Sequence, residues 1–210
     1  FARALAIELH DEDSLALADI DDGINQAEQG RHAQALALFE QARERAEREH
    51  LPKRAGQALV DIGVLQRRLG NYDLALDAYG RAATIIGAVG SLEAQASLAN
   101  NTGTVYLDRG DMRSGLAYYE KSLALRIRAQ ARPEELVSVL SNIGAVYAHQ
   151  DDPETALSYM FRALDALNGQ NENPTLPTLL SNIGNQLAAL HRYDEAMQHL
   201  ERGAATSTRL

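Results

Sequence analysis

Five glycines recur along this chain at a nearly constant interval. They are separated by 40, 40, 41 and 40 residues and lie within otherwise helix-favouring sequence, at Gly23, Gly63, Gly103, Gly144 and Gly184. A glycine inside a helix costs about 1 kcal/mol relative to alanine, so five glycines in register need a structural reason. We infer that a second helix approaches each of these ladder glycines closely, in a unit that repeats in tandem.

Other residue types keep their places relative to the ladder glycines. Turn-forming residues stand seven positions later, at Gly30, Gly70, Gly110, Asp151 and His191. Large residues stand sixteen positions later, at Phe39, Tyr79, Tyr119, Met160 and Leu200. This pattern predicts helix hairpins: a first helix carrying the glycine, a left-handed turn, and a second helix whose large residue fills the space beside the glycine.

The spacing predicts an all-α solenoid that forms a single domain over residues 1–210. Its five hairpins are expected at about 13–50, 52–89, 91–131, 133–170 and 173–208. Residues 1–5 match residues 79–83 and 160–164, so residues 1–10 are interpreted as half of a truncated repeat. Since no polar capping helix follows the last hairpin, we expect the chain to be cut from a longer protein at both ends.

Composition argues against several classes of function. The net charge of -9 disfavours nucleic acid and anionic membrane surfaces as partners. The absence of cysteine removes thiolate metal sites and cysteine nucleophiles. The carboxylates between Asp19 and Gly23 fail the spacing of a calcium loop, and no histidine or nucleophile motif has catalytic spacing. We therefore expect no enzyme activity, no metal, no cofactor and no membrane contact by this segment.

The repeated positions resemble the tetratricopeptide repeat (TPR). The resemblance is clearest over residues 97–124, where signature positions are filled by Leu98, Gly103, Tyr106, Gly110, Tyr119 and Ser122. The period of about 40 residues is similar to that of a subclass found in kinesin light chains and bacterial signalling proteins. The resemblance implies a right-handed solenoid whose first helices line a concave, partner-binding groove.

The expected groove contains a column two residues before each ladder glycine, which reads Asp21, Asp61, Asn101, Asn142 and Asn182. Asparagine amides both donate and accept hydrogen bonds, and the resemblance implies that they pair with the backbone of an extended peptide. The alternative is that they bond to neighbouring helices and set the geometry between repeats. The expected partner-binding residues are Asn100, Asn101, Ser141, Asn142, Ser181, Asn182, Asn185, Asp61, Arg68 and His149.

These features favour a non-catalytic domain that binds a protein or peptide. The resemblance and the truncated ends suggest the sensory or regulatory segment of a larger bacterial signalling protein, and a constitutive adaptor or assembly scaffold is the alternative. Lys53 and Lys121 lie away from the asparagines, which disfavours a chaperone tail as the ligand. The acidic residues Asp21, Glu28 and Asp61 favour a ligand with a basic end toward the first repeat. Homodimerisation through the end helices stays open, as does a cytoplasmic or periplasmic location.

Overall fold

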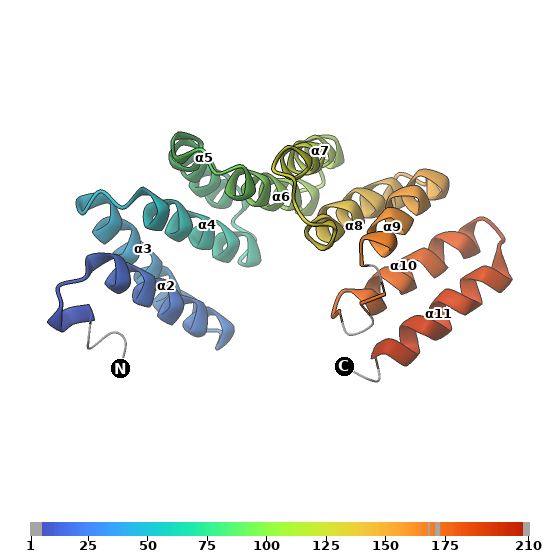
Figure 1. Cartoon of the computed structure of the whole chain (residues 1–210), viewed down its shortest axis with the longest axis horizontal. Helices are drawn as coiled ribbons and strands as arrows, with labels where there is room; N and C mark the ends of the chain where they lie inside the picture. The colour runs from blue at the N-terminus through green and yellow to red at the C-terminus, as the bar shows by residue number, and fades with distance from the viewer. Residues whose placement is uncertain (1–5, 168, 171–172, 208–210) are drawn as a thin grey trace. The chain divides into compact units, whose positions relative to one another are not determined.

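The computed structural model describes residues 6–167, 169–170 and 173–207, and every regular element in these ranges is an α-helix (Figure 1). The first helices of the hairpins are α2 (Glu12–Glu28), α4 (Pro52–Arg68), α6 (Leu92–Asp108), α8 (Pro133–His149) and α10 (Leu176–Ala189). The second helices are α3 (His32–Arg48), α5 (Tyr72–Val89), α7 (Met112–Arg128), α9 (Pro153–Ala166) and α11 (Tyr193–Ser207). The predicted all-α, solenoid-type fold is confirmed. Half of the predicted truncated repeat, residues 1–5, lies outside the described residues.

The chain folds as two compact units, one reaching to Asp111 and the other beginning at Met112. In the first unit each helix from α2 to α6 packs on the next, and α2 also contacts α4, which contacts α6. In the second unit the helices from α7 to α11 pack in the same consecutive way, and α8 contacts α10. Within each unit, neighbouring first helices therefore share one face.

The packing at the ladder glycines explains why alanine is absent there. At Gly63 an added Cβ would stand 2.2 Å from Cε1 of Tyr79, whereas carbon atoms in contact are separated by about 3.5–4.0 Å. Equivalent close approaches join Gly23 to Phe39, Gly144 to Met160 and Gly184 to Leu200. In each of these hairpins the second helix lies so near the first that its large side chain occupies the space of a methyl group.

The turns inside the hairpins use a left-handed residue. Gly30, Gly70 and Gly110 have φ angles of 74°, 76° and 87°. Asp151 and His191 take the equivalent places, each with a φ of 59°. The left-handed region disfavours residues with a Cβ by roughly 1–2 kcal/mol. The hairpin turns of the second unit are therefore more strained than those of the first.

Candidate functional site

The predicted groove column lies on the shared face of the first helices in each unit. Asp21, Asp61 and Asn101 occupy equivalent places on α2, α4 and α6, and the contacts between these helices bring the three places to one side of the first unit. Asn142 and Asn182 stand on the adjoining helices α8 and α10 of the second unit. Asp21 is exposed and the other four residues are half-buried, so each remains within reach of solvent.

The asparagines of the column differ in how the fold engages them. Among the described residues, the side chains of Asn101 and Asn182 have no hydrogen-bond partner, and the nearby Asn185 is exposed. Asn100 and Asn142 each take part in an interaction within the fold. The amides of Asn101 and Asn182 are therefore available to a ligand, whereas a structural role fits Asn100 and Asn142 better.

The remaining predicted residues extend the column without forming one cluster. Ser181 is half-buried and its Oγ donates to the carbonyl of Pro177 at 2.9 Å. Ser141 is half-buried beside Asn142 on α8. Arg68 and His149 are exposed at the last residues of α4 and α8, seven residues beyond Asp61 and Asn142 respectively. Seven residues of helix span about 10 Å, so these two side chains mark one end of each face rather than its centre.

The contact between α2 and α4, the α2–α4 seam, carries an unusual charge pattern. Near its start the Arg54 guanidinium donates two hydrogen bonds to the Asp13 carboxylate, at 2.7 and 2.8 Å. Two turns further along α4, Asp61 stands beside Asp21. Burial, and then the negative charge of Asp21, raise the pKa of Asp61 to about 6. The charge of Asp21 therefore acts on Asp61 as well as on Arg54, and Arg54 is the residue that is bonded to a carboxylate, that of Asp13.

The surroundings of Asp61 leave two buried polar atoms unsatisfied. Within the described residues, neither Oδ2 of Asp61 nor the hydroxyl of Tyr79 has a hydrogen-bond partner. Burial raises the pKa of Tyr79 to about 12, although the charge of Arg67 acts in the opposite direction, and the charge of Asp61 adds a smaller increase. Arg67, one of the arginines near this cluster, is paired with Asp108 at 2.7 Å. The sequence identified Asp61 as a groove residue but did not reveal that the fold gives its charge no partner.

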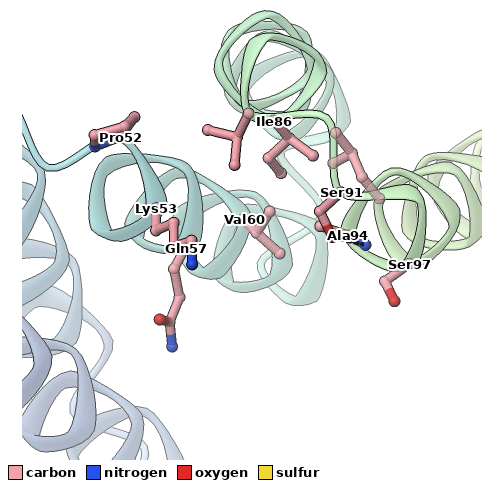
Figure 2. Close-up of a pocket in the computed structure, with 10 residues that line it drawn as sticks. Pro52, Lys53, Gln57, Val60, Ile86, Ser91, Ala94 and Ser97 are labelled. Atoms are coloured by element: carbon pink, nitrogen blue, oxygen red, sulfur yellow. Dashed lines mark hydrogen bonds between the residues drawn. The ribbon is translucent and has the colours of Figure 1, made fainter.

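A cavity of about 320 Å³ opens between α4, α5 and α6 (Figure 2). Its apolar lining includes Val60, Ile86 and Leu98, and Lys53 and Ser97 lie among its polar residues. The lining comes from three helices, and Val60 and Ser97 stand three and six residues before their ladder glycines. Sequence reasoning did not select this site. The available signal was an apolar valine at a position where the later repeats carry asparagine or serine.

The acidic stretch at residues 19–22 is part of helix α2. Asp19 is fully buried and lies 3.3 Å from Nε of Arg45 on α3, which also bonds to Glu12. Asp19 thus joins the two helices of a hairpin. In the described ranges, no three acidic or histidine side chains gather as metal ligands do. No helix within those ranges is both long and apolar enough to cross a bilayer.

Comparison with solved structures identifies proteins of the same fold. BtubC (BKLC) from P. vanneervenii superposes with a TM-score of 0.84 at 22% identity, covering 99% of this chain and 86% of that one. Aspartyl phosphate phosphatase F from Bacillus subtilis gives 0.81 at 17% identity, covering 98% and 55%. A kinesin-light-chain-type protein with nearly identical TPR-like repeats, from Podosopora anserina, gives 0.73 at 14% identity, covering 94% and 97%.

Comparison of sequences places the chain in a family. No curated protein sequence matches it. The sequence profile of the tetratricopeptide repeat matches residues 23–86, 94–169 and 135–209, which together span most of the chain. The solved structures add the similarity to kinesin-light-chain-type repeats that the period of about 40 residues had indicated. The chain therefore belongs to the tetratricopeptide repeat family, whose members are generally non-catalytic scaffolds for protein–protein interaction.

Proposed function

We propose that this chain binds extended peptide segments of a partner protein, each on the first-helix face of a single unit. The observation that carries the proposal is the pair of half-buried, unpartnered amides at equivalent positions, Asn101 on α6 and Asn182 on α10. Neither amide is engaged by the described part of the fold, and both residues remain within reach of solvent. A peptide backbone supplies both a donor and an acceptor for such an amide. Binding would thus use amides that folding leaves to water.

We propose further that binding regulates a larger bacterial signalling protein of which this chain is a segment. Aspartyl phosphate phosphatase F supports the idea of a longer protein by analogy of fold, because this chain matches 55% of that chain. A constitutive adaptor without a switching role is the alternative. The complete coding sequence separates the two, since an attached output domain or membrane-spanning segment favours the sensor and a lone repeat array favours the adaptor.

The binding proposal is tested by amide deletion. A partner peptide is first selected from a random peptide library displayed against the chain, and its affinity is then measured by calorimetry. Asn101→Ala and Asn182→Ala should each weaken binding by about fivefold to tenfold, which is the loss expected for one or two hydrogen bonds. Gln41→Ala, which removes an exposed amide from the second helix α3, is the matched control. Unchanged binding by the double asparagine variant would place the interface on the second helices instead.

A further inference from the structure

We propose that the first unit selects a peptide carrying a bulky apolar side chain and a cationic side chain two residues apart. The apolar side chain enters the cavity between α4, α5 and α6, and the cation lies over the carboxylates of Asp21 and Asp61. This inference rests on the proposed peptide-binding function and names the chemistry that its ligand presents to the first unit.

The cavity is suited to one large apolar group. Val60, Ile86 and Leu98 provide its walls, and a volume of about 320 Å³ lies at the lower end of the range for ligand sites. Gly56 contributes to the placement of one lining residue, because a Cβ there would stand 3.2 Å from Cγ1 of Ile86, a tight contact. Figure 2 shows Ile86 above Val60, with Ser97 across the opening on α6.

The α2–α4 seam is suited to one positive charge. Arg54 on α4 is paired with Asp13 on α2. Seven residues further along α4 comes Asp61, and eight residues further along α2 comes Asp21. Arg54 also attracts Asp21, whereas the described structure brings no cation to Asp61. The polar surroundings of Asp61 are also incomplete, because the Tyr79 side chain is 2% exposed and its hydroxyl has no partner in the described structure. A guanidinium or ammonium group over the exposed Asp21 carboxylate would supply the positive charge that the surroundings of Asp61 lack.

The two features lie on opposite sides of the same turn of α4. Val60 lines the cavity toward α6, and the next residue, Asp61, faces Asp21 on α2. A peptide crossing α4 in an extended conformation points residues i and i+2 to the same side, about 7 Å apart. That spacing allows one side chain to enter the cavity while the other reaches the carboxylates.

Lys53 favours one direction of the bound peptide over the other. It is exposed at the cavity rim, eight residues before Asp61, and the described structure shows it in no ion pair. Eight residues of helix correspond to about 12 Å. The lysine therefore disfavours a cation at its own end of the cavity, while the carboxylate pair favours a cation beside Asp61. A peptide with an acidic residue in place of the cation meets like charge at the carboxylates.

Peptide tryptophan fluorescence provides a direct test, because the chain contains no tryptophan. The probe is a blocked glycine–serine peptide with one tryptophan and one arginine two residues apart. Otherwise identical peptides carry glutamate or serine in place of arginine, or alanine in place of tryptophan. We expect the tryptophan–arginine peptide to bind about tenfold more tightly than the tryptophan–glutamate peptide at low salt, with the difference shrinking as salt is added.

Substitutions in the chain test whether the carboxylates and the cavity cause the preference for the tryptophan–arginine peptide. Asp61→Asn should remove most of the preference for arginine, whereas Asp77→Asn, a control on the exposed side of α5, should retain it. Lys53→Glu should strengthen binding of the arginine peptide about twofold to fivefold. Val60→Phe, which fills the cavity, should weaken every tryptophan peptide. Circular dichroism unfolding curves show whether each variant is folded. Asp61→Asn removes an unpaired charge and should not lower stability, so weaker binding by this variant cannot be ascribed to unfolding.

The inference is overturned if no tryptophan peptide binds, if the glutamate peptide binds as well as the arginine peptide, or if Asp61→Asn keeps the preference. Failure of the proposed peptide binding as a whole can be told apart from failure of this inference, because Asn182 lies in the second unit. If Asn182→Ala still weakens the library-selected peptide, peptide binding stands and only the apolar–cationic selection in the first unit is wrong.

Discussion

Asp61 keeps its negative charge in a place that destabilises the folded protein at neutral pH. The pKa of this carboxyl is raised from 3.8 to about 6 by burial and by Asp21. The folded protein therefore holds the proton more tightly than the unfolded chain does. The resulting stabilisation is complete below about pH 4 and is lost as the pH rises through 6. Replacing Asp61 by asparagine removes the ionisation and should stabilise the protein above that pH.

The magnitude follows from the two pKa values. Their difference corresponds to about 3 kcal/mol at pH 8 and about 1 kcal/mol at pH 4.5. Because the carboxylate is half-buried and the new amide also lacks a partner, we expect a measured gain of about 1–2 kcal/mol at pH 8. Urea unfolding of Asp61→Asn and the parent chain, followed by circular dichroism at both pH values, measures this gain.

The pH dependence separates this explanation from a general effect of the substitution. Asp77→Asn, at an exposed position on α5, should change stability little at either pH. The electrostatic argument would be refuted if Asp61→Asn were no more stable than the parent at pH 8, or if its gain were the same at pH 8 and 4.5. A confirmed gain together with weaker peptide binding would show that the carboxylate is kept for binding at the expense of stability.

Three further substitutions test the packing. Gly63→Ala should destabilise the first unit by about 1–3 kcal/mol in urea unfolding, because its Cβ would stand 2.2 Å from Tyr79. The control Gly80→Ala, with no neighbouring atom within 4 Å, should stabilise the unit by up to about 1 kcal/mol. Equal effects of the two substitutions would contradict the close approach at Gly63. Asp151→Gly should raise the unfolding midpoint, with a gain of about 0.5–1 kcal/mol, by relieving a φ of 59°, and a loss would mean that the aspartate side chain stabilises the turn. Arg45→Met should cost about 1–3 kcal/mol at pH 7, since it removes the Arg45 partner of the buried Asp19 carboxylate, and little change would show that the other contacts of Asp19 are sufficient.

The fold was predictable because its strongest signal is local and repeated. The ladder glycines and the large residues sixteen positions later report one contact between two helices of a hairpin, and that contact recurs at a constant interval. Left-handed turns at Gly30, Gly70 and Gly110 are predictable for the same reason, since glycine is the residue that tolerates this conformation. The division into two compact units has only a faint signal, because the interval from Gly103 to Gly144, which spans Asp111, is a single residue longer than the other intervals.

The candidate site was predictable only in part. The column of Asp61 and the asparagines follows from helix geometry once the repeat is aligned. The cavity could not be predicted, because its lining combines side chains of three helices whose spacing depends on Ile86 and Gly56. The charge of Asp61 is a similar case. The alignment of α2 with α4 decides whether Asp61 lies next to an arginine such as Arg54 or next to another carboxylate. No single repeat encodes this alignment.

The close approach at the ladder glycines also has a mechanical consequence. A second helix that occupies the space of a methyl group is interlocked with the first, so each such hairpin behaves as a stiff element. Bending within a unit is then concentrated in the joints between hairpins, such as the left-handed His50 between α3 and α4. A ligand held by both Asp21 on α2 and Asp61 on α4 would connect the hairpins on the two sides of that joint and brace it. Occupancy of a single site could thus be read out as stiffness, without any change inside the hairpins themselves.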